Sequence, residues 1–151
     1  MARKLVREWK KVFKTDLPYI VYELKELSKP PALVMLEGPV GAGKTTFVQH
    51  FIGENGVVSP TYNVISEFKQ IIHADFYRLE KQEEVLQLEI PHYTDDKHWF
   101  FVEWGEKFAR RLLRELPESW TPYILEIGVG KPTVEGEEPA RNFSLWTYTE
   151  D

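Results

Sequence analysis

The stretch GPVGAGKT at residues 38–45 has the residue types and spacing of a phosphate-binding loop. It matches the pattern G-x-x-x-x-G-K-[ST] and lies between an apolar run and a helix-like segment. Glycines let backbone N–H groups face an anion, the following helix N-terminus reinforces them, and Lys44 adds a charge near the β- and γ-phosphates. Thr45 would offer its hydroxyl to Mg²⁺, and Thr46 would contact a phosphate. The predicted nucleotide-binding residues of this loop are Gly38, Val40, Gly41, Ala42, Gly43, Lys44, Thr45 and Thr46.

A phosphate-binding loop needs a carboxylate opposite it, usually at the C-terminal end of an apolar strand, to hold Mg²⁺ directly or through water. Two acids have this position: Glu103 ends WFFVE, and Asp75 ends IIHAD. Two acids beside one metal can divide the work, so that one coordinates it and the other orients or deprotonates the attacking water. We therefore predict Thr45, Asp75 and Glu103 as metal-site residues, with either acid in the catalytic role.

Three further residues lie close to these motifs in the sequence. Thr61 of SPTY follows the first helix after the loop, where a threonine can sense the γ-phosphate or can cap a strand. His73 lies two residues before Asp75 and has no second histidine at ligand spacing, so we expect hydrogen bonding or packing from it. Trp104 follows Glu103 and either packs in the core or lines the nucleotide pocket.

Composition places the 151-residue chain among ordinary globular proteins of one domain, residues 1–151. It has no cysteine, which excludes disulfides and thiol nucleophiles, and no apolar run long enough to span a bilayer. The N-terminus shows no apolar signal core. We therefore expect a cytoplasmic protein with no membrane partner.

The formal charge of −5 conceals a basic N-terminal segment, residues 1–14, which holds six of the 19 basic residues and one of the 24 acidic ones. Its apolar residues recur at helical spacing, so we predict a short amphipathic helix. The acidic remainder argues against a broad nucleic-acid-binding face. The basic segment itself is either a solvated face or an arm that touches phosphate.

The order of apolar and polar patterns predicts an α/β fold. We expect a single domain like that of P-loop NTPases, with a mixed sheet, a parallel core, antiparallel additions and helices on both faces. The expected strands are residues 32–38, 62–68, 70–77, 98–103, 123–130 and 142–149, with 62–68 and 70–77 as a hairpin or a tight strand pair. The expected helices after the N-terminal segment are residues 15–27, 44–52, 80–89 and 105–116.

Four motifs taken together, GPVGAGKTTF, SPTY, HADFYRL and VEWGE, resemble the TsaE family in their order and intervals. The resemblance covers residues 33–145. It implies a compact P-loop ATPase that binds ATP or ADP with Mg²⁺ in the biosynthesis of threonylcarbamoyladenosine on tRNA. It also implies the partner proteins TsaB and TsaD, with hydrolysis resetting their complex and tRNA contacted only through that complex.

Carried over by position, the resemblance assigns phosphate binding to the loop and Mg²⁺ to Thr45. It assigns a switch-like role to Thr61, metal binding and hydrolysis to Asp75 and Glu103, and a place close to the nucleotide to Trp104. One position departs from the family pattern: Glu89 stands where a glycine is usual. The basic residues 1–14 are also peculiar to this chain.

Two other functions are compatible with a phosphate-binding loop. A small-molecule kinase would need mobile arginines to clamp the transferred phosphoryl group. Here Arg110, Arg111 and Arg114 fall on a predicted helix, and the loop 131–141 offers only Lys131 and Arg141. A nucleotide-sensing scaffold would bind ATP and ADP with little turnover and dock different partners in the two states.

Overall fold

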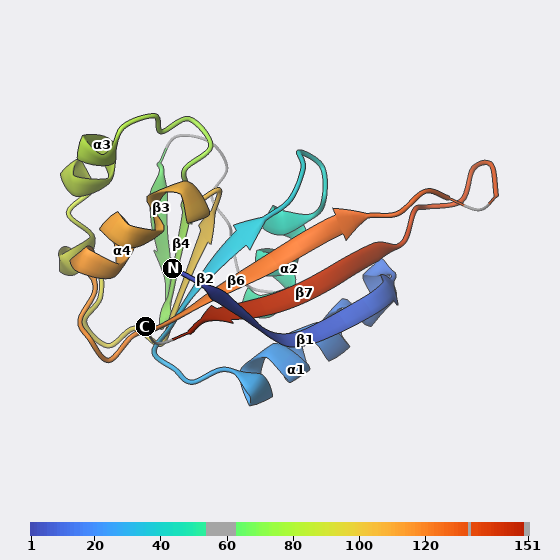
Figure 1. Cartoon of the computed structure of the whole chain (residues 1–151), viewed down its shortest axis with the longest axis horizontal. Helices are drawn as coiled ribbons and strands as arrows, with labels where there is room; N and C mark the ends of the chain where they lie inside the picture. Colours follow the sequence, from blue (N-terminus) through green and yellow to red (C-terminus); the bar gives the residue numbers. More distant parts are fainter. Residues whose placement is uncertain (54–62, 133, 150–151) are drawn as a thin grey trace.

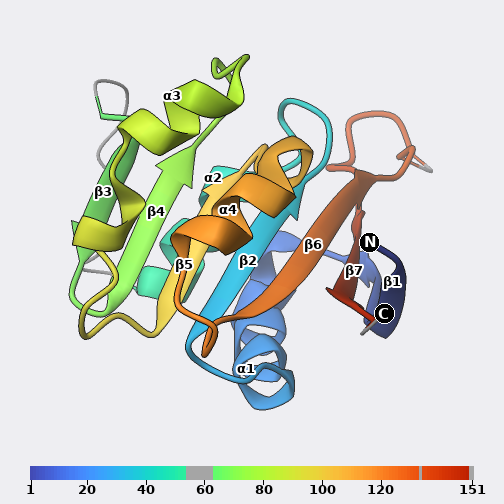
Figure 2. The ribbon, with the colours of Figure 1, turned by 60° about the vertical axis from the view of Figure 1, so that its left-hand side comes forward.

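Seven strands form one twisted mixed sheet in the computed structural model, which describes residues 1–53, 63–132 and 134–149 (Figures 1 and 2). The strand order is β1-β7-β6-β2-β5-β4-β3. Strands β6, β2, β5 and β4 are parallel neighbours, whereas β1, β7 and β3 are added antiparallel. The strands are β1 (Arg3–Val12), β2 (Ala32–Glu37), β3 (Ile65–Phe68), β4 (Ile71–Asp75), β5 (Trp99–Glu103), β6 (Thr121–Val129) and β7 (Arg141–Tyr148). The predicted parallel core with antiparallel additions is confirmed.

Helices cover both faces of this sheet, as the sequence predicts (Figure 2). Helices α1 and α2 pack on one face, and α3 and α4 pack on the other. The α-helices are α1 (Leu17–Leu27), α2 (Lys44–Ile52), α3 (Gln82–Gln87) and α4 (Ala109–Glu115). Short 3-10 helices are η1 (Lys14–Asp16), η2 (Ile90–His92) and η3 (Glu106–Phe108).

Strand β2 lies in the middle of the sheet and is buried on both sides. Because successive side chains of a strand point to opposite faces, Val34 and Leu36 join the core under α1 and α2, while Leu33 and Met35 join the core under α3 and α4. All four side chains are fully buried. This double burial requires an uninterrupted apolar run, which is why the sequence identifies the strand so clearly.

Most other elements lie where the sequence predicts them. Helix α1 buries Leu17, Ile20, Val21 and Leu24, at the three-and-four spacing of one helix face. Strands β3 and β4 pair antiparallel as the predicted hairpin. No helix within the described ranges has the length and apolar character needed to cross a bilayer.

The prediction for residues 1–14 is wrong, because Arg3–Val12 form the edge strand β1 rather than a helix. The strand pairs antiparallel with β7, and its register shifts between Leu5 and Arg7 and again between Trp9 and Val12. Each shift adds a residue and breaks the two-residue alternation of a regular strand. The inward-facing residues Val6, Trp9 and Val12 therefore recur every three positions, which imitates a helical pattern.

Glu89, which stands where glycine is usual in the family pattern, adopts a backbone conformation typical of glycine. Glu89 has φ 55° and ψ 47°, the left-handed conformation that glycine adopts readily, and it lies between α3 and η2. Its carbonyl accepts a hydrogen bond from the His92 N–H at 2.9 Å. The turn thus keeps the backbone shape that glycine favours although the side chain is not glycine.

We expect Glu89→Gly to raise the free energy of unfolding by about 0.5 kcal/mol. A non-glycine residue in the left-handed conformation destabilises the folded state by about 1–2 kcal/mol, and glycine avoids this cost. Glycine also loses more conformational entropy on folding, which reduces the gain by roughly 0.5–1 kcal/mol. Urea unfolding followed by tryptophan fluorescence measures the change. Glu89→Ala is the matched control, since it removes the carboxylate but keeps Cβ, and an equal gain from both variants would contradict the prediction.

Candidate functional site

The loop at residues 38–43 joins the C-terminal end of β2 to the N-terminus of α2. Gly43 has φ 107°, and it directly precedes the helix that begins at Lys44. A Cβ on Gly38 would lie 2.4 Å from the backbone oxygen of Ile127 on β6, so no larger residue fits there. The loop is therefore fixed between the central strand and its neighbour, and its shape depends on these two glycines.

Lys44 is held against its own loop. Its Nζ donates hydrogen bonds to the carbonyl oxygens of Gly38 at 2.7 Å and Pro39 at 3.0 Å. The ammonium also lies 4.1 Å from the centroid of the Trp104 ring, within cation–π range. Burial lowers the pKa of Lys44, and the nearby carboxylates of Glu103, Glu37 and Asp75 oppose that shift. An anion that binds Lys44 would replace these two carbonyl partners with charge-assisted hydrogen bonds.

Glu103 is the centre of the polar contacts beside the loop. The Thr45 hydroxyl donates to the Glu103 carboxylate, with its oxygen 2.8 Å from Oε1 and 2.9 Å from Oε2. On the other side, His73 Nε2 lies 2.7 Å from Glu103 Oε2. The Glu103 side chain is almost fully buried between these two partners. Of the two roles expected for His73, hydrogen bonding or packing, the structure shows this hydrogen bond.

Asp75 lies one strand further out and is in register with Glu103 across the parallel pair β4 and β5. Parallel strands end at the same edge of a sheet, so the two carboxylates come from neighbouring positions. Asp75 is exposed, and its Oδ1 accepts a hydrogen bond from the Tyr77 N–H at 3.0 Å. One acid is thus buried and doubly bonded, whereas the other faces solvent.

The loop and both acids border one cavity of about 390 Å³. Nine predicted residues line it: Val40, Gly41, Gly43, Lys44, Thr45, Thr46, Asp75, Glu103 and Trp104. Gly38 and Ala42 do not, because Gly38 lies beneath the loop as a partner of Lys44 and Ala42 is packed in the core. Thr61 and the rest of its SPTY motif, residues 59–62, fall outside the described residues. The structure therefore brings nine of the predicted residues together around one cavity.

The donor set suits Mg²⁺ that is shared with a phosphate ligand. Within the described residues there is no group of three or more His, Asp or Glu side chains that could hold a metal ion by themselves. Mg²⁺ usually takes one or two carboxylates and completes its octahedral shell with water and phosphate oxygens. The Thr45 hydroxyl and the Glu103 and Asp75 carboxylates fit that incomplete shell.

Tyr77 and Trp104 form an aromatic wall of the cavity that sequence reasoning only half predicts. Their ring centroids are 5.2 Å apart, and Tyr77 is largely exposed. Trp104 has φ 61°, and its backbone N–H donates to the Leu36 carbonyl at 3.1 Å, which holds the ring at the mouth. The position of Tyr77 two residues after Asp75 is the signal that could have identified it.

Arg141 contacts the loop from the side opposite the acids. Its Nε donates to the Ala42 carbonyl at 3.1 Å, and its Nη2 lies 3.4 Å from the Gly41 oxygen. Its Nη1 also donates to the Pro139 carbonyl at 2.6 Å. Arg141 therefore links the start of β7 to the phosphate-binding loop. It does not have the position of the mobile lid arginine that a kinase would need. Sequence reasoning does not predict this contact, because it depends on the pairing of β7 with β6.

The three arginines of the predicted helix do not reach the cavity. Arg111 pairs with Glu115 along α4, with Nη1 3.2 Å from Oε1. Arg110 borders a different cavity near the N-terminus, together with Arg3 and Glu106. Among the described residues, Lys44 is the one basic side chain that lines the cavity beside Glu103.

Glu37 is a half-buried acid directly before the loop that sequence reasoning missed. Burial, and to a smaller extent repulsion from Glu106, raises its pKa from 4.5 to about 7, while hydrogen bonds from the backbone of Glu106 and Gly105 oppose the shift. Its Oε2 has no hydrogen-bond partner among the residues that the structure describes. The strand that carries the loop thus ends in a carboxyl group that resists ionisation.

Comparison with known proteins places these features in one family. The family model described as "Threonylcarbamoyl adenosine biosynthesis protein TsaE" matches residues 13–133. The chain is 34% identical over 115 residues to the tRNA threonylcarbamoyladenosine biosynthesis protein TsaE of Rickettsia felis, covering 70% of this chain and 62% of that protein. It is 31% identical over 116 residues to the protein of the same name from Bacillus subtilis, covering 72% of each. The match thus spans less than two thirds of the Rickettsia felis relative.

A solved structure shares the fold over almost the whole chain. The crystal structure of Bacillus subtilis YdiB superposes with a TM-score of 0.58 and 23% sequence identity. The superposition covers 99% of this chain and 89% of the other. At this identity the likeness concerns the arrangement of sheet and helices alone, and it agrees with the mixed sheet described above.

We expect Glu37→Gln to raise the free energy of unfolding at pH 8 by about 1–2 kcal/mol relative to the parent, with little difference at pH 4. Because the folded state raises the pKa of Glu37, it binds the proton more tightly than the unfolded state does, and this contribution is lost as the pH rises from 4.5 to about 7. Because the Glu37 side chain is partly exposed to solvent, we expect only about 1–2 kcal/mol, less than the free-energy difference that the whole pKa shift would give.

Denaturant unfolding at pH 4, 6 and 8 measures this effect. Glu118→Gln, which changes an exposed carboxylate, is the matched control. A gain from Glu37→Gln that is equal at all three pH values would show that ionisation of Glu37 is not its cause.

Proposed function

This chain belongs to the TsaE family, and from that premise we propose that it binds Mg-ATP and hydrolyses it in the biosynthesis of N6-threonylcarbamoyladenosine at position 37 of tRNA. One observation carries the ATPase assignment. The Thr45 hydroxyl of the P-loop meets the Glu103 carboxylate at the end of a neighbouring parallel strand, beside Asp75 and Lys44. This set provides for a phosphate chain, a metal ion and an attacking water in one cavity.

The P-loop binds the phosphate chain. Its backbone N–H groups and the N-terminus of α2 face the phosphate oxygens, and Thr46 adds a hydroxyl. Lys44 exchanges the carbonyls of Gly38 and Pro39 for oxygens of the β- and γ-phosphates. Thr45, Glu103 and Asp75 would hold Mg²⁺, which would supply positive charge to stabilise the phosphate oxygens.

The two acids take different roles because their surroundings differ. Glu103 is bonded to Thr45, the predicted Mg²⁺ ligand, and His73 holds its other side, so we assign Glu103 to the metal shell. Asp75 is exposed and one strand farther from the loop, so we assign it to orienting or deprotonating the attacking water. His73 is a positioning residue that acts through Glu103.

We propose that the TsaB and TsaD proteins are the partners, that hydrolysis resets their complex, and that tRNA is contacted through it. The site supports a partner-driven enzyme, because in this structure Lys44 is engaged with its own loop and Glu103 with Thr45 and His73. A partner that reorders these contacts would raise turnover. The reaction would take place in the cytoplasm.

The kinase alternative lacks the arginine clamp it would need, since no arginine lines the cavity within the described residues. The scaffold alternative differs in whether turnover is required. Glu103→Ala with retained ATP binding and undiminished tRNA modification in cells would favour the scaffold. Formation of ADP together with a phosphorylated metabolite would favour the kinase.

We expect phosphate release from Mg-ATP to be slow for the chain alone and to rise at least tenfold when the TsaB and TsaD proteins of the same organism are added. Glu103→Ala should abolish the rise, because it removes a carboxylate from the metal shell. A malachite-green or coupled phosphate assay measures both. Absence of any rise with the parent chain would argue against partner-driven hydrolysis.

A pair of isosteric variants separates the two acids. We expect Asp75→Asn to lower turnover by about 10²–10⁴-fold, the usual contribution of a general base, while the affinity for ATP keeps its dependence on Mg²⁺. Glu103→Gln should lower turnover and also weaken the Mg²⁺ dependence of ATP affinity. Calorimetric titrations with and without Mg²⁺ measure the affinities, and the reverse pattern would exchange the assigned roles.

A further inference from the structure

The turn after Glu103, residues 104–106, begins with a residue in a strained conformation. Trp104 has φ 61°, a left-handed conformation that is uncommon for residues other than glycine and an outlier for a bulky side chain. Such a conformation persists only where neighbouring contacts hold it. In this conformation the centroid of the Trp104 ring lies 4.1 Å from Lys44 Nζ, at the cavity that the P-loop borders. The contacts that hold this turn therefore also shape the cavity.

Strand β2, which leads into the P-loop, holds this turn from one side. The Leu36 carbonyl accepts a hydrogen bond from the Trp104 N–H at 3.1 Å. The carboxyl group of the next residue, Glu37, accepts hydrogen bonds from the backbone N–H groups of Gly105 and Glu106. The last two residues of β2 thus bind all three residues of the turn.

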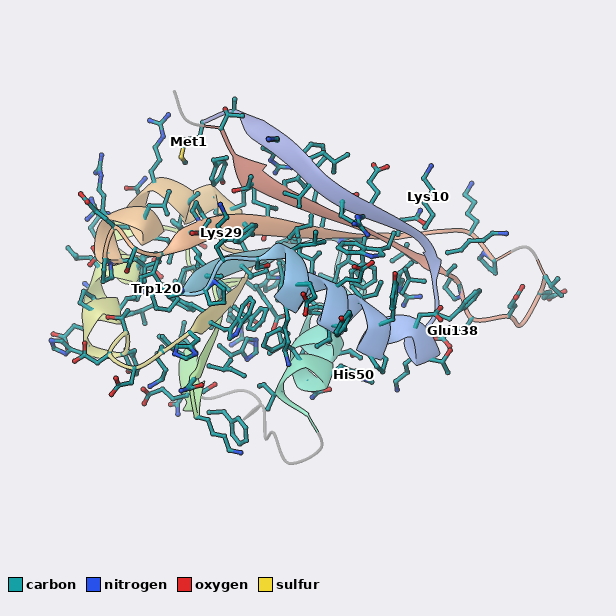
Figure 3. The ribbon with its side chains drawn as sticks, turned by 90° about the horizontal axis from the view of Figure 1, so that it is seen from below. Met1, Lys10, Lys29, His50, Trp120 and Glu138 are labelled. Carbon is teal, nitrogen blue, oxygen red and sulfur yellow. The ribbon has the colours of Figure 1, made fainter. Side chains whose placement is uncertain are left out.

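Arg3, near the start of β1, holds the same turn from the other side. Its Nη2 donates to the carboxylate of Glu106, and its Nη1 donates to Glu126 Oε1 on β6 at 2.9 Å. The guanidinium carbon also lies 5.8 Å from the centroid of the Trp146 ring on β7, within cation–π range. Figure 3 shows the start of β1, at Met1, beside the ribbon that leads into α4, and both segments border one cavity. Glu106 is thus held through its backbone from β2 and through its side chain from β1.

The Arg3 charge stabilises a group of three carboxylates behind the P-loop. Glu37 and Glu126 are opposite each other in the register of the parallel strands β2 and β6, and Glu106 is close enough to repel Glu37. Like charges that are partly removed from water repel one another more strongly than in water. Within the described part of the chain, Arg3 is the one basic side chain that forms ion pairs with these acids, and it contacts two of the three. Loss of Arg3 would leave Glu106 facing Glu37 without compensation and would drive the turn away from β2.

We propose that Arg3 is a positioning residue of the ATPase site, which acts through Glu106 to hold the turn at residues 104–106 beside the P-loop. The proposal rests on the proposed function, because it takes Mg-ATP to occupy the cavity next to this turn. Glu103 directly precedes the turn, so a displacement of the turn moves the carboxylate assigned to the metal shell. The phosphate-binding loop keeps its own contacts, and Arg3 therefore controls turnover more than nucleotide affinity.

Arg7 offers a matched comparison on the same strand. Its Nη1 donates to Glu23 Oε1 on α1 at 2.9 Å, so this ion pair lies on the face of the sheet opposite α4. Arg3→Met and Arg7→Met each remove one positive charge and its ion pairing from β1 while keeping an unbranched apolar side chain. Of the two, Arg3→Met is the variant that removes a contact to the turn.

The test measures phosphate release from Mg-ATP, with and without the TsaB and TsaD proteins, and Mg-ATP affinity by calorimetric titration. We expect Arg3→Met to lower kcat about tenfold, because a displacement of about 1 Å in a site can lower a rate by up to roughly 10²-fold. The Kd for Mg-ATP should stay within twofold of the parent, since the phosphate-binding loop is unchanged. Arg7→Met should change neither value by more than twofold.

Two further variants make the result specific to Glu106. Arg3→Lys keeps the charge but lacks the planar fork that contacts two carboxylates, so it should retain part of the turnover that Arg3→Met loses. In a Glu106→Gln background, Arg3→Met should lower kcat less than twofold, because the ion pair that it breaks is already lost. Urea unfolding of each variant checks that the protein is folded under the assay conditions.

The outcomes separate the inference from the function on which it rests. A kcat of Arg3→Met within twofold of an active parent would overturn the positioning role and leave the ATPase proposal intact. An equal loss in Arg7→Met, an equal loss of Mg-ATP affinity, or a full tenfold effect in the Glu106→Gln background would also overturn it. Failure of the parent to bind or hydrolyse Mg-ATP would overturn both proposals.

Discussion

The hydrogen bond between the Thr45 hydroxyl and the Glu103 carboxylate joins two elements that lie far apart in the sequence. Thr45 lies in the first turn of α2, and Glu103 ends β5, 58 residues later. The bond can form only because β2 and β5 are parallel neighbours in register, with Leu36 opposite Glu103. That register in turn depends on the apolar run of β2, whose alternate side chains fill both cores. A shift of one residue would reverse which face each side chain occupies and would move the carboxylate away from the loop.

The sequence predicts the parts of this arrangement that depend on local rules. Gly38, Gly43, Lys44 and Thr45 form a loop whose chemistry is contained in a few consecutive residues. An acid at the end of an apolar strand is also visible locally, which identifies Glu103 and Asp75. The contact of Thr45 with Glu103 follows once the strands are taken as parallel, since their C-terminal ends share an edge.

Other parts depend on contacts that no local pattern contains. Arg141 reaches the P-loop because β7 pairs antiparallel with β6. The pKa of Glu37 is raised because the fold removes much of its carboxyl group from water and, to a smaller extent, because it places Glu106 nearby. The error at residues 1–14 has the same origin, because two register shifts against β7 space the inward side chains of β1 like those of a helix. Periodicity alone cannot distinguish a helix from a strand that is interrupted in this way.

Strand β1 also determines how the sheet ends. It is an outermost strand of the sheet, and the backbone groups on its free side would invite pairing with another chain. Lys4, Lys10 and Lys11 are exposed along it, and Lys11 has φ 55° at the second irregularity. The lysine charges disfavour the approach of a second strand, and the irregular backbone offers no continuous edge for it to pair with. The basic N-terminal segment thereby protects the protein against edge-to-edge aggregation, a role that requires no bound phosphate.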